Sequence, residues 1–471
     1  MDGLKYLAKN VGLLTVSQFS TKLITFLLIP LYTNVLSTVE YGTYDFYNST
    51  IALLIPILTL NICDSALRFT IDKDSNKKGI LSISIYHLLI SLFLASILSI
   101  VNYLTDAIPI LNEHPLLFIL LFFAGSITGV LTNYCRGADY VKEVAISGVF
   151  GSVMVVFLNL LFLLPLHLGL IGFFLAQIIG LFCQSFYLIS SIKLWRFVDL
   201  GHIDHCLHTD MLSFCKPLVL NNIFWWINGL SARYIVIGIC GLAANGIFSV
   251  SYKIPSILTM LQGIFSQAWT LSAVKDYDEG DKSGFFLKMY NSYNVCMLLV
   301  CSILIVFSRD IANILYAKDF FLAWEYVPFL LISTVFGAMA GYIGGIYSAV
   351  KDSKAFARTS IYGAIINVAV TLVLVYIIGV RGAAIGAFFS YYVVWIMRVL
   401  DIKRYIKIKI NLKKDHFSYL LLVIQSILLY VMSGEKLFYF YESLLFLMLV
   451  VINQETLMAI TRKVVSHKKI V

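Results

Sequence analysis

Long apolar runs, each of about 20 residues, follow one another along most of this chain and are separated by short polar segments. A helix of that length spans about 30 Å of hydrocarbon, which is the thickness of a bilayer core. Hydrophobic residues make up 60% of the sequence and charged residues 13%, whereas roughly a quarter of the residues are charged in soluble domains. Strands of a membrane barrel would be about half as long and would alternate in polarity. The sequence therefore predicts an all-α integral membrane protein.

The apolar runs predict about 14 membrane-spanning helices. Their approximate bounds are 10–34, 42–63, 81–103, 115–135, 144–166, 170–192, 216–240, 246–270, 290–308, 326–350, 358–378, 382–400, 417–433 and 437–460. Most of the 35 Lys and Arg residues fall in segments that are cytoplasmic if the N-terminus is inside, as the positive-inside rule requires. Both termini are therefore predicted to be cytoplasmic. The net charge of +9 is interpreted as lipid-facing charge and not as a nucleic-acid surface.

Three sequence patterns occur twice in the same order, with about 210 residues between the copies. They are a glycine after a turn at Gly42 and Gly246, a lysine followed by a glycine at Lys142/Gly151 and Lys354/Gly363, and a Gly-x-x-Gly turn at Gly169 and Gly379. Such a duplication is typical of secondary transporters, whose ligand site lies between the halves. We predict six-helix bundles at 1–192 and 216–400, a cytoplasmic linker at 193–215, and a basic loop with two additional transmembrane helices at 401–471.

The eight cysteines are scattered and include no C-x-x-C pair. One cluster of Cys and His residues lies within a single short segment and consists of His202, His205, Cys206 and His208. Structural zinc sites usually draw ligand pairs from two segments. We therefore predict no metal site and interpret the other cysteines as small buried apolar residues.

Polar and charged side chains inside the predicted spans are candidates for a substrate site, because such groups are costly to place in hydrocarbon. The candidates are Gln18, Lys22, Asp45, Asn222, Arg233 and Lys253. Lys22 lies about twelve residues from either end of its span, too deep to reach the interface easily. Asp45 and Lys253 lie closer to the predicted external ends of their spans, so reaching the interface is an alternative for both. A structural ion pair between Lys22 and Asp45 is another alternative to a substrate-binding role.

Three cations and one carboxylate on polar helix faces predict a hydrated, net-cationic cavity near the interface between the repeats. Such a cavity suits an anionic headgroup, because arginine offers forked donors to phosphate and lysine offers a point charge. Trp225, Trp226 and Tyr252 are candidates for stacking on sugar rings. Prolines and glycines in or beside the spans are typical of helices that bend during transport.

Three segments of this chain carry a recognisable pattern: Glu40–Tyr44, Gly246–Pro255 and Tyr347–Lys354, the last followed by Gly363 and Asn367. In these segments the chain resembles bacterial polysaccharide-biosynthesis membrane proteins, the O-antigen-type oligosaccharide-lipid flippases of the multidrug/oligosaccharidyl-lipid/polysaccharide exporter superfamily. Lipid II flippases and MATE drug antiporters are relatives within this superfamily. The resemblance covers about residues 1–400 and implies the same membrane fold.

The resemblance implies a flippase that moves an undecaprenyl-diphosphate-linked oligosaccharide from the cytoplasmic to the outer leaflet of the bacterial inner membrane by alternating access. Lys22, Arg233 and Lys253 would hold phosphates or acidic sugars, and Asp45 would balance charge or couple to an ion. No cofactor is expected beyond coupling to protons, sodium or the membrane potential. Membrane lipids, a polysaccharide polymerase and chain-length proteins are the expected partners, and nucleic acid is not.

Other functions stay open at this point. A drug or metabolite/cation antiporter of the same fold would favour buried carboxylates, whereas buried cations dominate here. A membrane glycosyltransferase or polysaccharide polymerase would need catalytic acids, bases or metal ligands gathered in a large loop or cavity, which the sequence does not show. We therefore do not expect an enzyme. A scaffold for the assembly machinery is disfavoured by the intramembrane charges.

Overall fold

The computed structural model describes residues 12, 17, 19–72, 75–199, 201, 203–275, 277–350, 352–432, 434–435 and 437–468. These residues are almost entirely helical and contain no strand. They form two compact units, the N-terminal unit (Met1–Trp226) and the C-terminal unit (Ile227–Val471). The all-α fold predicted from the sequence is thereby confirmed. The division into two bundles, a linker and a C-terminal segment stays a prediction.

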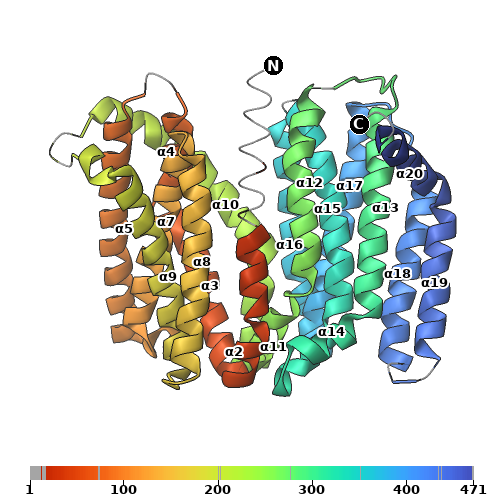
Figure 1. Ribbon diagram of the computed structural model, residues 1–471, viewed down its shortest axis with the longest axis horizontal. Helices are drawn as coiled ribbons and strands as arrows, with labels where there is room; N and C mark the ends of the chain where they lie inside the picture. The colour runs from red at the N-terminus through yellow and green to blue at the C-terminus, as the bar shows by residue number, and fades with distance from the viewer. Residues whose placement is uncertain are drawn as a thin grey trace. The chain divides into compact units, whose positions relative to one another are not determined.

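The N-terminal unit is built mainly from long helices that pack side by side (Figure 1). Its elements are α2 (Ile29–Val35), α3 (Thr38–Leu58), α4 (Ile62–Thr70), α5 (Lys77–Thr105), α6 (Pro109–Asn112), α7 (Pro115–Gly137), α8 (Val141–Leu163), α9 (Gly169–Ile192), η1 (Leu194–Phe197) and the first part of α10 (His205–Cys240). A capping box starts α3, where the Ser37 hydroxyl accepts from Glu40 N at 3.2 Å and the Glu40 carboxylate accepts from Ser37 N at 2.8 Å.

The C-terminal unit contains the rest of α10 and a further set of packed helices (Figure 1). Its elements are α11 (Leu242–Ser251), α12 (Pro255–Lys275), α13 (Phe285–Val306), α14 (Ser308–Leu315), η2 (Lys318–Glu325), α15 (Val327–Ala349), α16 (Ser353–Ile378), α17 (Arg381–Asp401), η3 (Ile402–Arg404), α18 (Leu412–Met432), α19 (Phe438–Ile452) and α20 (Gln454–Lys468). The helix α15 is the central element, because it packs against α12, α13, α17 and α18.

The described part of the chain contains 10 helices that are long and apolar enough to cross a membrane, or up to 12 if each bent pair is one span. The predicted number of about 14 membrane-spanning helices is not confirmed, and two of the predicted spans show why. The N-terminal part of the first predicted span lies mostly outside the described residues, and a shorter apolar helix, Phe19–Val35, is described. The eighth predicted span is broken into α11 and α12 just before Pro255, whose missing N–H suits the first turn of a new helix.

The repeated glycines have the same structural role in both units. In the N-terminal unit, a Cβ on Gly151 of α8 would lie 2.9 Å from the Gln184 side chain of α9. In the C-terminal unit, a Cβ on Gly363 of α16 would overlap the Val394 side chain of α17. Both pairs of helices thus approach closely at the repeated glycine, as small residues allow in membrane proteins. The sequence repeat therefore corresponds to a repeated helix contact within each unit.

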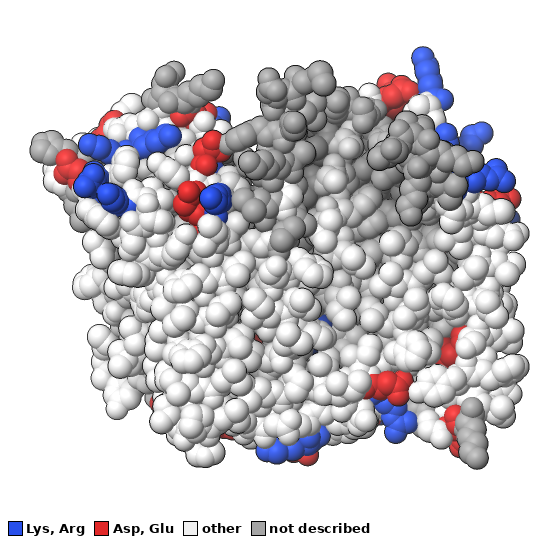
Figure 2. All heavy atoms as spheres, in the orientation of Figure 1, with Lys and Arg blue, Asp and Glu red and all other residues white. Residues whose placement is uncertain are grey.

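Charged side chains gather at the helix ends, and a broad uncharged band lies between them (Figure 2). Large apolar side chains are exposed on the long helices, for example Phe93 and Leu104 on α5 and Tyr376 on α16, at 66%, 77% and 81%. A surface of this kind is stable in lipid and not in water. Together with the long apolar helices, it identifies a multi-pass membrane protein.

Candidate functional site

The helix that carries Lys22 has the polar face predicted from its sequence. Hydroxyls on this face donate within the helix, from Thr21 Oγ1 to Ser17 O at 2.8 Å and from Thr25 Oγ1 to Lys22 O at 3.0 Å. Ser17 Oγ also donates to Ala145 O at 2.8 Å, which fastens this helix to α8. The Lys22 side chain is exposed. Gln18 lies outside the described residues, and its predicted role stays a prediction.

Asp45 is a buried carboxylate on α3, with 9% of the residue exposed. The neighbouring Tyr44 ring packs between the Phe173 and Phe174 rings of α9, with centroid distances of 4.5 and 5.3 Å. One turn further, Asn48 Nδ2 donates to Tyr44 O at 2.9 Å. Asp45 therefore lies on a helix whose flank is packed by aromatic rings, a setting that exposes few groups to water. The predicted ion pair between Lys22 and Asp45 stays a prediction.

The first part of α10 packs against the bend between α3 and α4, which measures 59°. The chain turns there through Leu60 and Asn61, whose φ angles are 51° and 58°. Asn222 Nδ2 donates to Asn61 Oδ1 at 2.9 Å, and Trp226 Nε1 donates to Ser49 O at 2.8 Å. The structure thus brings Asn222 to the bend and gives it a structural partner. Its contact with a substrate stays a prediction.

Arg233 and Lys253 are brought to the same part of the C-terminal unit. The Arg233 guanidinium carbon lies 5.5 Å from the centroid of the Tyr252 ring, in cation–π geometry. Tyr252 and Lys253 form the break between α11 and α12, and both cations are partly buried. Ala232 and Phe248 belong to the apolar cluster around this contact. Broken helices build the binding sites of many transporters, so this break is the best-placed part of the predicted site.

Two motif residues of the family resemblance have a structural role at the second part of α10. Asn367 Nδ2 donates to Asn228 O at 3.0 Å, and Asn228 Nδ2 donates to Ser360 O at 3.2 Å. A Cβ on Gly363 would lie 3.5 Å from Asn228 Oδ1. These contacts fasten α10 to α16 in the C-terminal unit, within five residues of Arg233.

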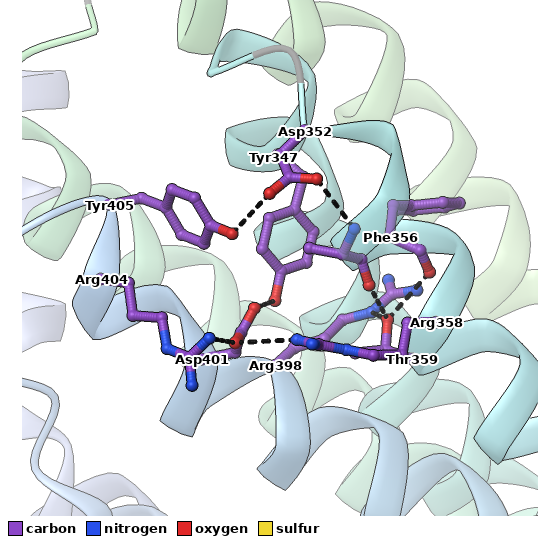
Figure 3. A network of polar contacts seen from close by, with 10 residues as sticks. Tyr347, Asp352, Phe356, Arg358, Thr359, Arg398, Asp401, Arg404 and Tyr405 are labelled. Carbon is purple, nitrogen blue, oxygen red and sulfur yellow. Dashed lines mark hydrogen bonds and ion pairs between the residues drawn. The ribbon is translucent and has the colours of Figure 1, made fainter.

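A polar network that the sequence did not predict lies where α15 and α16 meet the end of α17 (Figure 3). At its centre, Asp401 accepts from Tyr347 Oη at 2.9 Å and from Arg358 Nη2 at 3.1 Å. Arg404 Nη1 lies 3.4 Å from the same carboxylate. The Arg358 and Arg404 side chains are 51% and 71% exposed. Asp401 thus joins one buried hydroxyl and two exposed cations.

The same network fixes the connection between α15 and α16. Tyr405 Oη donates to Asp352 Oδ2 at 2.7 Å, and Ala355 N donates to the other oxygen at 2.9 Å (Figure 3). These hydrogen bonds hold the pKa of Asp352 below its usual value, and the bond to Asp352 raises the pKa of Tyr405 to about 12. The sequence signal was the segment Tyr347–Lys354, which we had singled out without assigning its role.

Arg398 is the most deeply buried cation of this network, with 4% of the residue exposed. Its guanidinium donates to Ala340 O at 2.8 Å and to Thr359 Oγ1 at 3.0 Å, and lies 4.4 Å from the Phe356 ring centroid. These contacts satisfy the charge within the protein.

Among the residues that the structure describes, no group of three His, Cys, Asp or Glu side chains could hold a metal ion. One histidine of the Cys/His cluster contacts a histidine of another helix: His208 Nε2 lies 2.8 Å from His87 Nε2 of α5. His202 lies outside the described residues.

Comparison with known proteins identifies the family. Residues 7–274 match the family described as "Polysaccharide biosynthesis protein". The multidrug and toxin extrusion protein 1 of Rattus norvegicus is 24% identical over 280 residues, which cover 56% of this chain and 47% of that protein. The protein of the same name from Homo sapiens is 25% identical over 247 residues, which cover 50% and 42%. The chain thus spans less than half the length of these relatives.

Solved structures match over most of the chain. An inward-facing multidrug resistance MATE family transporter of the MOP superfamily matches with a TM-score of 0.69 at 14% identity, covering 82% of this chain and 95% of that one. A MOP superfamily transporter from Pyrococcus furiosus, described as having a binding pocket of reverse polarity that suggests a different function, matches with a TM-score of 0.58 at 15% identity, covering 85% and 97%.

Because the family match covers more than half of the sequence, the chain belongs to the polysaccharide biosynthesis protein family. Its fold is that of the MOP superfamily transporters. The resemblance stated from the sequence motifs is confirmed at this level, and the fold is that of MATE-like membrane proteins. The proteins that it matches are transporters and not enzymes.

Proposed function

We propose that this transporter is a flippase for an undecaprenyl-diphosphate-linked oligosaccharide, which it moves from the cytoplasmic to the outer leaflet. The observation that carries the proposal is the pair of partly buried cations at the α11–α12 break, Arg233 and Lys253. A diphosphate offers several oxygen acceptors, which match the forked donors of arginine and the point charge of lysine. Membership of the polysaccharide biosynthesis family supports the choice of a glycan-bearing substrate.

In this account Arg233 binds the diphosphate and Tyr252 holds the guanidinium in position through its ring face. Lys22 and Lys253 add charge for a second phosphate or for acidic sugars, while the lipid tail stays in the bilayer. The helix break at Tyr252 and Lys253 lets α11 and α12 change their relative angle, as broken helices do during alternating access. The expected setting is the inner membrane with both termini in the cytoplasm, where a polymerase and chain-length proteins would use the product.

Transport of a defined glycolipid tests this proposal. Purified protein is placed in vesicles that carry a labelled undecaprenyl-diphosphate oligosaccharide, and the label that becomes accessible to a membrane-impermeant glycosidase is measured over time. We expect a protein-dependent rate well above that of empty vesicles. A rate equal to that of empty vesicles would contradict the proposed substrate.

A drug or cation antiporter is the second candidate function. Similarity to multidrug and toxin extrusion proteins favours it, as does the buried carboxylate Asp45, because organic cations pair with carboxylates. The same vesicles loaded with a fluorescent organic cation distinguish the two functions. Extrusion of the dye that Asp45→Asn abolishes, without glycolipid movement, would favour the antiporter.

A further inference from the structure

Polar side chains that are at most 2% exposed lie where α13, α18 and α19 pack together in the C-terminal unit. They include Asn294, Ser302, Asp415, Gln425, Glu442 and Asn453. The outer face of α19 is apolar, since Phe440 and Val451 are 64% and 60% exposed. Helices α18 and α19 lie side by side next to α13 (Figure 1). Polar groups that face inward from a membrane helix are costly and usually serve a function.

Glu442 is the most unusual member of this interface. The residue is 0% exposed and shares the buried face of α19 with Phe438 and Leu449. Neither carboxyl oxygen has a hydrogen-bond partner among the described residues. The adjacent Gln425 accepts from Ser302 Oγ at 2.8 Å through Oε1, and within the same set of residues its Nε2 atom is also without a partner. An ionised carboxylate in this setting would be strongly destabilised, so the carboxyl group binds a proton instead.

No cation occurs in the central stretches of the helices around Glu442. No Asp, Glu, Lys, Arg or His occurs at 289–308, 417–434 or 443–454, which are the stretches of α13, α18 and α19 around it, or within α15 at 327–349. Charged residues on the packed elements therefore lie at their ends. These residues are Lys288, Arg309, Asp310, Lys413, Lys414, Asp415 and Glu455, with His416 beside Asp415, and Glu435 and Lys436 belong to the α18–α19 connection. Among the other titratable residues, Cys301 precedes Ser302 and Tyr441 precedes Glu442 in the sequence, and Tyr430 and Tyr439 belong to α18 and α19.

Asp415, near the N-terminal end of α18, is a second buried carboxyl group whose hydrogen-bond partners can be compared with those of Glu442. It is likewise buried, at 2% exposed, but its carboxylate accepts from Tyr290 Oη at 3.0 Å and from Asn294 Nδ2 at 3.1 Å. Those donors support a negative charge. Asp415 therefore has the partners of a structural carboxylate, whereas Glu442 has the surroundings of a carboxyl group that gains and loses a proton.

We propose that Glu442 is a proton-binding site of this transporter and that it exchanges its proton with water at the α18–α19 connection. Glu442 lies in the fifth position of α19, about 6 Å along the helix from Phe438. The proton bonds to one carboxyl oxygen, and the Gln425 side chain is the polar group beside it. When the helices around it separate, the proton passes to water and the carboxylate is hydrated. Coupling of this exchange to glycolipid movement rests on the proposed function, whereas proton binding itself does not.

Infrared difference spectroscopy tests the proton site without any substrate. The carbonyl stretch of protonated carboxylic acids is recorded in purified protein as the pH is changed. We expect one titrating band to disappear in Glu442→Gln and to remain in Glu435→Gln, which removes an exposed carboxylate from the same connection. An unchanged set of titrating bands in Glu442→Gln would overturn the proposal. If that variant does not fold, Gln425→Leu is expected to shift the band, and an unshifted band would overturn the proposal equally.

Vesicle transport tests the coupling. A pH gradient is expected to speed glycolipid movement several-fold in the parental protein and in Glu435→Gln, and to leave the rate of Glu442→Gln unchanged. Full acceleration in Glu442→Gln would show that this proton does not drive transport. If the parental protein moves no glycolipid with or without a gradient, the proposed substrate is wrong, while the infrared result still decides whether Glu442 binds a proton.

Discussion

Substitutions of Asp401 test whether the polar network stabilises the fold through its buried hydrogen bond or through its exposed ion pairs. Asp401→Ala leaves the Tyr347 hydroxyl without its acceptor, and Tyr347 is 1% exposed. An unsatisfied buried hydroxyl costs about 1–3 kcal/mol. The two arginine pairs add about 0–1 kcal/mol each, because both side chains are more than half exposed and water screens them. We expect Asp401→Ala to lower the free energy of unfolding by about 1–5 kcal/mol.

Asp401→Asn keeps an acceptor for Tyr347 and removes the charge. Its expected cost is that of the two exposed arginine pairs, about 0–2 kcal/mol. The free energy of unfolding in detergent, measured by denaturant titration, compares the two variants. Asp72→Ala is the matched control, because it breaks the exposed Arg68–Asp72 pair and is expected to change stability by less than about 0.5 kcal/mol.

A double-mutant cycle with Tyr347→Phe isolates the buried bond. If Tyr347→Phe does not reduce the cost of Asp401→Ala, the hydroxyl–carboxylate bond is not the source of the stability. Equal losses in Asp401→Asn and Asp401→Ala would refute the reasoning as well, since charge would then outweigh the buried hydrogen bond.

Two further predictions concern helix packing and pH. Gly180→Leu is expected to destabilise the N-terminal unit by about 1–3 kcal/mol, because a side chain at this position overlaps Val155 across the α8–α9 contact. Gly238→Ala is the control in the same unfolding assay, and it should be neutral or stabilising because the space around Gly238 is open. Because the folded-state pKa of Asp352 is depressed, its bond to Tyr405 contributes stability above the unfolded pKa, and that contribution is lost as pH falls through the folded value. Tyr405→Phe should therefore lower the melting temperature at neutral pH and make less difference at acidic pH, and an equal effect at both would contradict this assignment.

The sequence predicted a membrane protein with an all-α fold, and it showed the repeated glycines, because these features follow from run length, hydropathy and spacing. It did not predict the α11–α12 break, since Tyr252 and Lys253 interrupt a run whose hydropathy stays high on both sides. The role of Asp401 was also missed. Its partners Tyr347 and Arg358 lie 54 and 43 residues away in the chain, and such distances leave no local pattern.

The candidate site shows the same limit. Lys22, Asp45, Arg233 and Lys253 were selected one by one, from the cost of placing charge in hydrocarbon. That argument found Arg233 and Lys253 without predicting that Tyr252 would link them. It also passed over Glu442, because the last two spans lie outside the duplication. Burial and missing hydrogen-bond partners, which identify Glu442, are properties of the packed structure.

Glycolipid transport by a charge-neutralised variant tests the central claim most directly. In vesicles with matched protein amounts, the triple variant Lys22→Ala, Arg233→Ala, Lys253→Ala is compared with the parental protein and with Lys282→Ala, which removes an exposed loop lysine. Each lost charged hydrogen bond to phosphate is worth about 1.5–3 kcal/mol, or about 10- to 150-fold in affinity. The account predicts that the triple variant loses transport while the control keeps it. Transport by the triple variant at the parental rate would contradict a cationic substrate site.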